Sequence, residues 1–147
     1  MRYPKHLQIA TKLFTVAFVL LCTYVPFLSH AGEEDLFGIW KTGVSKKGSY
    51  LHVDIRKCED KICGFIVNAF DKNDEPVADY PHVGKIMVWN MQPKSSPNSW
   101  GKGGIWAPDT DKKYKSGMVL TDDTLKVTGC ISLGWPCRSQ TWTPVSP

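Results

Sequence analysis

The sequence has few of the residues, and none of the motifs, on which common catalytic sites depend. Beyond residue 31 it holds only two histidines, His52 on an expected outward strand face and His82 in an expected loop. It has no Gly-x-Ser-x-Gly elbow and no His-Glu-x-x-His helix, so neither an α/β-hydrolase nor a zincin is indicated. The sequence favours a protein that is not an enzyme, and catalysis by loop Asp or His residues stays open as an alternative.

The chain also has little net charge once its N-terminal segment is set aside. It contains 18 Lys and Arg against 14 Asp and Glu. Three of the basic residues, Arg2, Lys5 and Lys12, lie in the first 31 residues, where there is no acidic residue. Fifteen basic and fourteen acidic residues remain, a net charge of +1. A near-neutral domain with scattered lysines lacks the basic surface that nucleic acid requires, so no nucleic-acid partner is expected.

Residues 1–31 have the pattern of a secretory signal peptide. Residues 13–25 are almost wholly apolar, Pro26 interrupts the run, and Ser29 and Ala31 supply the small residues that a signal peptidase requires. We expect cleavage after Ala31 and a periplasmic or secreted domain with no transmembrane segment. The alternative is an uncleaved anchor, but the apolar run is shorter than the roughly 20 residues that span a bilayer.

The remaining residues, 32–147, predict one all-β domain. They show no helical period, internal repeat or low-complexity tail. Leu51, Val53 and Ile55 alternate with polar residues, as in a strand with one buried face. Eight strands are predicted, at Phe37–Thr42, Ser49–Lys57, Ile62–Phe70, Lys85–Met91, Gly103–Ala107, Lys113–Leu120, Thr124–Ile131 and Arg138–Thr143.

Four cysteines in this domain form two close pairs, Cys58 with Cys63 and Cys130 with Cys137. Each pair brackets an expected hairpin tip, where facing residues lie within disulfide reach. Two local disulfides are favoured over crossed pairing, and such bonds indicate an oxidising compartment outside the cytoplasm. Zinc binding is the rival hypothesis, although neither spacing is the short Cys-x-x-Cys of a zinc knuckle.

No metal site or cofactor is expected. Two groups of acidic and amide residues resemble fragments of calcium loops, Asp71 with Asn73, Asp74 and Glu75, and Asp109 with Asp111. Neither has the glycine and distal glutamate of an EF-hand, so turn residues are favoured. The glycines at 101, 103 and 104 enter a strand and not a helix, which favours a bulge over a phosphate loop.

Gly38-Ile39-Trp40 resembles the Gly-x-Trp that opens lipocalin and calycin barrels. In those barrels the tryptophan plugs the closed end beneath a basic residue of the last strand. The resemblance implies this structural role for Gly38 and Trp40, and Arg138 is the candidate cover through a cation–π contact.

Several further motifs resemble the small exported bacterial proteins grouped as domain of unknown function 2147. They are Cys58 to Cys63 with Gly64 and Ile66, Trp100 to Pro108, Lys112-Lys113-Tyr114, Leu125 to Cys130, and Cys137 to Trp142. The resemblance implies an eight-stranded antiparallel calycin-like barrel in the bacterial envelope, and no activity. The chain departs from the family pattern at Ala107, where the family has aspartate, at Asp111, where it has glycine, and near Ala78 and Tyr80, where it has arginines.

All six tryptophans lie within residues 32–147. They can fill a small β core, or some of them can surround the entrance of a cavity, since eight strands allow either a filled interior or one small ligand. The candidate ligand-binding residues are Trp89, Trp100, Trp106, Tyr80 and Tyr114. The predicted function is a non-enzymatic exported barrel that binds a small hydrophobic or aromatic molecule. The alternative is an envelope interaction or structural module with a filled core.

Overall fold

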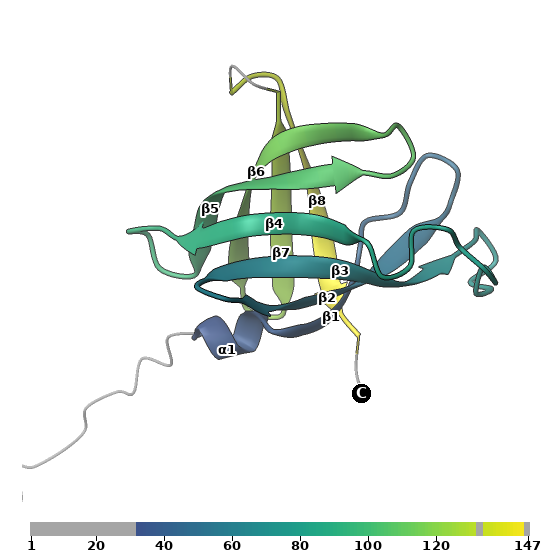
Figure 1. Ribbon diagram of the computed structural model, residues 1–147, viewed down its shortest axis with the longest axis horizontal. Coiled ribbons are helices and arrows are strands. Elements are labelled where there is room, and N and C mark those ends of the chain that lie inside the picture. Colours follow the sequence, from purple (N-terminus) through teal and green to yellow (C-terminus); the bar gives the residue numbers. More distant parts are fainter. Residues whose placement is uncertain (1–31, 132–133, 146–147) are drawn as a thin grey trace, which may run out of the picture.

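The protein is a closed antiparallel β-barrel (Figure 1). The computed structural model describes residues 32–131 and 134–145, so the expected signal segment, residues 1–31, lies outside the described residues. The strands are β1 (Gly38–Lys41), β2 (Tyr50–Cys58), β3 (Lys61–Phe70), β4 (Ile86–Pro93), β5 (Ser99–Ala107), β6 (Lys112–Thr121), β7 (Thr124–Cys130) and β8 (Cys137–Pro144). Each strand pairs with the next in sequence, and β8 pairs with β1. The prediction of an eight-stranded antiparallel barrel is confirmed.

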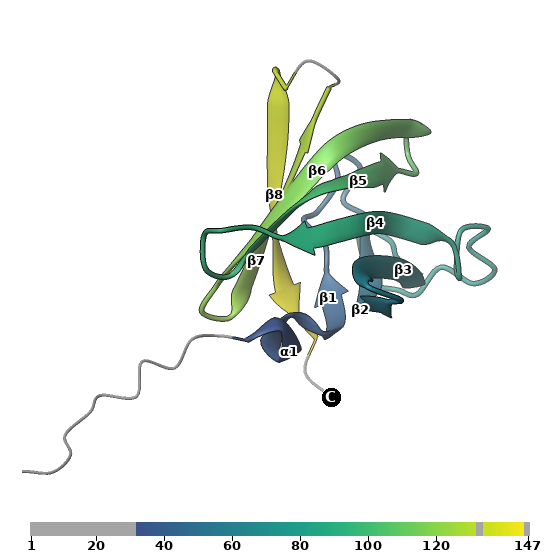
Figure 2. The same cartoon turned by 60° about the vertical axis from the view of Figure 1, so that its left-hand side comes forward.

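The up-and-down order gives the barrel two different ends. The short turns β2–β3, β4–β5 and β6–β7 lie at one end together with the helix α1 (Glu33–Leu36), and we call this the closed end. The connections β1–β2, β3–β4, β5–β6 and β7–β8 lie at the other, which we call the open end. Figure 2 shows the two ends well separated, with α1 below the barrel and the β7–β8 hairpin extending above it.

Two local features lead the chain from α1 into the barrel. The backbone N–H of Gly32 donates to Asp35 Oδ2 at 2.6 Å, which satisfies one of the free amides at the start of α1. Gly38 then adopts φ +132°, a conformation that residues with a Cβ rarely reach. Gly38 therefore has a structural role at the start of β1. The helix was not predicted, because four residues are too few to show a helical period.

Strand β5 begins four residues earlier than predicted, at Ser99. The register with β6 shifts between Trp100 and Gly103, and Lys102 has φ +59°. This bulge adds an unpaired residue and breaks the alternation on which the sequence prediction depended. Trp100 and Gly101 consequently belong to the strand and not to the preceding loop.

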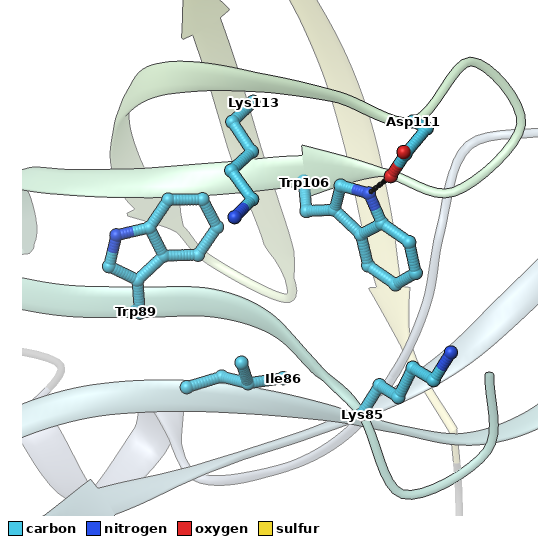
Figure 3. Close-up of a pocket in the computed structure, with 6 residues that line it drawn as sticks. All are labelled: Lys85, Ile86, Trp89, Trp106, Asp111 and Lys113. Carbon is cyan, nitrogen blue, oxygen red and sulfur yellow. Dashed lines mark hydrogen bonds between the residues drawn. The ribbon is translucent and has the colours of Figure 1, made fainter.

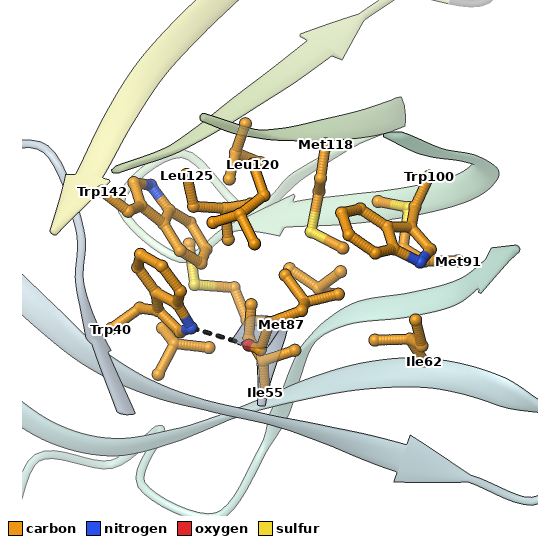
Figure 4. Packing of buried hydrophobic residues seen from close by; sticks show 14 of the residues in the cluster. Trp40, Ile55, Ile62, Met87, Met91, Trp100, Met118, Leu120, Leu125 and Trp142 are labelled. Atoms are coloured by element: carbon orange, nitrogen blue, oxygen red, sulfur yellow. Dashed lines mark hydrogen bonds between the residues drawn. The ribbon is translucent and has the colours of Figure 1, made fainter. Parts of the chain in front are cut away.

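Three tryptophans fill the barrel interior from the closed end to the middle (Figure 4). Trp40, Trp100 and Trp142 are at most 4% exposed, and they pack with aliphatic and methionine side chains of the facing strands. The buried cluster comprises Leu36, Trp40, Val53, Ile55, Ile62, Ile66, Met87, Val88, Met91, Trp100, Met118, Leu120, Leu125, Val127 and Trp142. For these three indoles the core-filling interpretation is correct.

Trp40 seals the closed end, but Arg138 does not cover it. Trp40 pairs with Pro144 near the end of β8, whereas Arg138 is exposed and pairs with Gly129 near the start of β8. Six residues of a strand separate the two positions by roughly 20 Å. The expected cover was wrong because β8 runs from the open end toward the closed end. The helix α1 covers the indole instead, and Trp40 Nε1 donates to the Leu36 carbonyl oxygen at 2.9 Å.

Both local disulfides predicted from the spacing are present. Cys58 and Cys63 join β2 to β3 with their Cα atoms 5.8 Å apart, and Cys130 and Cys137 join β7 to β8 with Cα atoms 4.1 Å apart. The first pair lies at the closed end and the second at the open end, which rules out crossed pairing. Because all four thiols are oxidised, neither pair offers a thiolate to zinc. The disulfides are consistent with an exported protein.

Replacing Cys58 and Cys63 together by serine is expected to lower the free energy of unfolding by about 2 kcal/mol, because the bond closes a short loop. Urea unfolding of the oxidised proteins measures the difference. The Cys130/Cys137 double substitution gives a similar loss, and the two losses add, since the bonds lie at opposite ends of the barrel. A loss below about 0.5 kcal/mol would show that strand pairing alone holds the hairpin.

Candidate functional site

The barrel interior is not filled at its open end. A cavity of about 120 Å³ lies there, bordered by the β1–β2, β3–β4 and β5–β6 connections and by the adjoining ends of the strands. Its lining consists of Thr42, Gly43, Ser45, Ser49, Tyr50, Leu51, Tyr80, Met87, Ala107, Pro108, Asp109 and Gln140. We call this cavity the open-end pocket.

The wall of the open-end pocket is apolar at its base and polar at its rim. Leu51 and Met87 continue the inward face of the core, to which Met87 belongs. Thr42 is buried, and its hydroxyl accepts the Leu51 N–H at 3.0 Å and donates to the Gly43 carbonyl oxygen at 3.2 Å. The hydroxyl thereby joins β1 to β2 at the point where their regular pairing ends.

Gln140 on β8 supplies a hydrogen-bond donor beside the pocket. Its Oε1 accepts the Trp142 Nε1–H at 3.1 Å, which fixes the orientation of the amide. A carbon added at Gly43 would lie 3.2 Å from Gln140 Cβ, so the β1–β2 connection packs directly against this side chain. Within residues 32–131 and 134–145 the Gln140 NH₂ group has no hydrogen-bond acceptor, which leaves both of its N–H bonds available to a ligand.

Tyr80 comes from the long β3–β4 connection and closes one side of the open-end pocket. Its ring contacts His82 edge-on with the ring centroids 5.1 Å apart, and His82 contacts Trp106 in the same way at 5.0 Å. Burial, followed by the charge of Asp109, raises the pKa of Tyr80 above its ordinary value of 10.0. The phenol therefore stays protonated at neutral pH and can donate a hydrogen bond.

The five aromatic residues predicted to line one entrance do not converge there. Tyr80 lines the open-end pocket, but Trp100 is buried at the closed end, where it pairs with Pro93 and Met118. The prediction for Trp100 was wrong because the bulge in β5 concealed its place at the start of the strand. Trp89 and Trp106 lie on the outer face of the barrel, beside a shallow depression that Figure 3 shows from close by.

Tyr114 borders a second shallow depression, next to Trp89. It is half-buried and pairs with Ile105 across β5 and β6. The structure therefore does not bring it to the open-end pocket with Tyr80. The sixth tryptophan, Trp135, stands 79% exposed in the β7–β8 connection.

Of the residues that line the open-end pocket, only Tyr80 was predicted from the sequence to bind a ligand. Thr42 follows β1 directly, Leu51 and Met87 lie second in β2 and β4, and Gln140 is an exposed residue in the middle of β8. The sequence pattern marks Leu51 as inward-facing, since it belongs to the alternating apolar set of β2. It does not mark Thr42 and Gln140, because a polar residue on an inward face interrupts the hydrophobic alternation that identifies such a face.

The histidines are packed in aromatic clusters and not free on the surface. The His52 ring lies 4.5 Å from that of Phe70 and 5.8 Å from that of Tyr50. Burial, followed by the positive charge of Lys41, lowers the pKa of His52 below its ordinary value of 6.5. His52 is thus neutral at pH 7 and serves as an aromatic packing group.

The acidic residues of the β3–β4 connection form a turn. Asp71 Oδ1 accepts the backbone N–H groups of Asn73 at 2.8 Å and Glu75 at 3.1 Å, which lowers the pKa of Asp71. In the part of the chain that the structure describes, no three His, Cys, Asp or Glu side chains are grouped as metal ligands.

No helix in the same part has the length and apolar character needed to span a bilayer.

The closed barrel, with its plugged closed end and a pocket at the open end, has a lipocalin-like fold. A solved structure described as "Protein HP1028 from the human pathogen Helicobacter pylori belongs to the lipocalin family" is similar to it, with a TM-score of 0.59 and 14% sequence identity. The alignment covers 76% of this chain and 83% of the other. At this identity the likeness concerns the fold.

Residues 38–144 match the family described as "Uncharacterized protein conserved in bacteria (DUF2147)". The chain belongs to this family, as its motifs had indicated. No curated protein matches the sequence. The family description assigns no activity, so a function has to be argued from the residues of the barrel itself.

Proposed function

We propose that the protein is an exported, non-enzymatic barrel that binds one small ring-shaped ligand in the open-end pocket. The observation that carries this proposal is the uneven filling of the interior. Side chains pack the closed end and the middle of the barrel, whereas a hollow remains where the strands meet the long connections. A ligand can enter there without unfolding any strand pair.

The size and lining of the pocket select the ligand. A cavity of about 120 Å³ is close to the roughly 150 Å³ apolar cavity that admits benzene in an engineered protein, so a single ring fits. Leu51 and Met87 offer an apolar base, and Tyr80 offers an aromatic side wall. The NH₂ group of Gln140 and the phenol of Tyr80 are donors for one polar substituent on that ring.

Export is supported by the signal-like segment and by the disulfides. Two oxidised cysteine pairs suit a periplasmic or secreted protein, and cleavage after Ala31 leaves a domain that starts just before α1.

The absence of an enzymatic role is part of the proposal. The titratable groups that border the pocket are Tyr50, Tyr80 and Asp109, and no hydrogen bond joins any two of these side chains in the described residues.

Phenol is expected to bind the mature protein at one site, and filling the pocket should abolish this binding. Ala107 lies at the rim at the end of β5, so Ala107→Trp places an indole in the hollow without removing any core residue. Calorimetric titration should show the affinity for phenol falling at least tenfold. Val119→Trp, on an exposed position of β6, is the matched control and leaves the affinity unchanged.

The proposal fails if Ala107→Trp folds with an unchanged melting temperature and still binds phenol as the parent protein does. It fails equally if the parent protein binds no phenol and native mass spectrometry of the exported protein shows no retained molecule.

One observation favours a second candidate, an envelope interaction module. Trp135 is 79% exposed at the tip of a hairpin that extends from the barrel and is closed by the Cys130–Cys137 disulfide. A single exposed indole on a hairpin closed by a disulfide can anchor a partner protein. This role is preferred if envelope extract yields a partner that Trp135→Ser releases while no small molecule binds the barrel.

A further inference from the structure

A second hollowed surface lies on the outside of the barrel, over β4, β5 and β6 (Figure 3). It is formed by Lys85, Ile86, Trp89, Trp106, Lys113 and Lys115, and we call it the tryptophan groove. Ser116, Met118 and Leu120 of β6 are buried toward the interior. The alternate residues Lys113 and Lys115 therefore face outward.

The strand register places both indoles on the same outer face as these lysines. Trp106 pairs with Lys113, and Lys115 pairs with Gly104, which in turn pairs with Trp89. Figure 3 shows the Lys113 side chain between the two indoles. Trp89 and Lys113 border two adjoining hollows of about 430 and 300 Å³, so the groove is continuous across three strands.

Both indoles are fixed in place. The Trp89 ring lies directly on the backbone of Gly104, where any Cβ would overlap atoms of the ring. Trp106 Nε1 donates to Asp111 Oδ1 at 2.8 Å, and its ring is held by the edge-on contact with His82. The rings are therefore pre-organised, and a ligand that stacks on them incurs little ordering cost.

The groove is cationic. The residues that line the two hollows include three lysines, Lys85, Lys113 and Lys115, and one carboxylate, that of Asp111, whose Oδ1 already accepts the Trp106 N–H. Lys85 Nζ lies 5.9 Å from the Trp106 ring centroid and 3.1 Å from His82 Nδ1. None of the three lysines forms a salt bridge with another of the described residues. Their charge is thus available to an external anion.

We propose that the tryptophan groove binds an anionic saccharide chain. The fixed indoles present flat apolar faces to the C–H faces of sugar rings, and the ammonium groups bind carboxylate or phosphate groups on the same chain. Two adjoining hollows that share Trp89 and Lys113 suit successive sugar units. This site is separate from the open-end pocket and does not depend on the ligand proposed there.

Two other occupants fit the groove less well. A lipid surface calls for protruding apolar side chains, whereas Trp89 and Trp106 are half-buried and border hollows. Single-stranded nucleic acid also stacks on indoles, but its affinity depends on many phosphate contacts, and this groove has three ammonium groups in a nearly neutral mature chain.

Tetragalacturonate and a phosphorylated oligosaccharide serve as probes in calorimetric titrations of the mature protein. At least one should bind, and Trp89→Ala or Lys113→Ala should weaken its binding at least tenfold. Trp89→Phe, which keeps an aromatic ring, restores most of the affinity. Trp135→Ala and Lys57→Ala remove an exposed tryptophan and an exposed lysine elsewhere and leave the affinity unchanged. Raising the salt concentration weakens binding of the anionic probe.

The inference is overturned if neither anionic saccharide binds, or if binding persists undiminished in Trp89→Ala and Lys113→Ala. Equal affinity for neutral tetragalactose would show that the lysines take no part. Groove-dependent binding of an oligothymidylate or of anionic vesicles, without saccharide binding, would assign the surface to another ligand class. Ala107→Trp separates the two sites, since it should abolish phenol binding and leave saccharide binding intact.

Discussion

Replacing Trp40 by alanine is expected to lower the free energy of unfolding by about 3 to 5 kcal/mol. Trp40 is 3% exposed, closes one end of the barrel and donates its indole N–H to the Leu36 carbonyl oxygen. The substitution leaves a cavity and an unpaired buried carbonyl at the contact between β1 and α1, and both effects destabilise the fold. Denaturant unfolding measures the loss.

The matched control is Trp135→Ala, which removes the same side chain from a position that is 79% exposed. It should change the free energy of unfolding by less than about 0.5 kcal/mol. Equal losses from the two substitutions would contradict the role of Trp40 as the plug of the closed end.

Gly103→Ala is expected to lower the free energy of unfolding by about 3 kcal/mol. A Cβ at Gly103 would overlap the Trp89 carbonyl oxygen and lie 2.8 Å from Met91 Sδ and 3.0 Å from the Met91 backbone nitrogen. Two of these atoms belong to the backbone of β4, so β4 and β5 would have to separate. Thermal and urea unfolding of the purified variant report the change.

Gly101→Ala in the same strand is the control for this effect. Its added carbon meets only the flexible side chain of Lys94, the nearest atom being Cδ at 3.1 Å, and that side chain can move aside. We expect a change within about 0.5 kcal/mol. If Gly103→Ala were as mild as Gly101→Ala, the close approach of β4 and β5 would not be a requirement of the fold.

The alternation of residues, the cysteine spacing and the Gly-x-Trp motif were sufficient to predict the barrel and both disulfides. The alternation and the cysteine spacing are local patterns, and the Gly-x-Trp motif is a family resemblance. None of them requires knowing which distant segments contact each other. The error at Arg138 was avoidable, because an eight-stranded antiparallel order places the start of β8 at the end opposite Trp40.

The candidate site was harder to predict than the fold. The β5 bulge hides the true position of Trp100, since it changes the face and the boundary of the strand at once. The pocket residues Thr42 and Gln140 are polar on an inward face, so no hydrophobic period marks them. The tryptophan groove depends on Gly104 lying beneath Trp89, a contact between two strands that only the register reveals.

The two proposed sites bind different kinds of ligand. The open-end pocket is proposed to bind a single ring inside the barrel, and the tryptophan groove is proposed to bind a charged chain on the outer face of β4 to β6. They share Tyr80, His82 and Trp106 as neighbours, because this row of rings runs from the pocket wall to the groove.

The most direct test of the central claim is an amide chemical-shift titration of ¹⁵N-labelled protein comprising residues 32–147 with phenol. The account predicts shifts concentrated at Thr42, Gly43, Leu51, Met87 and Gln140, with little change around Trp40 and Trp100 at the closed end. Shifts centred on the closed end, or none at phenol concentrations in the millimolar range, would contradict a barrel that is packed at one end and open to a ligand at the other.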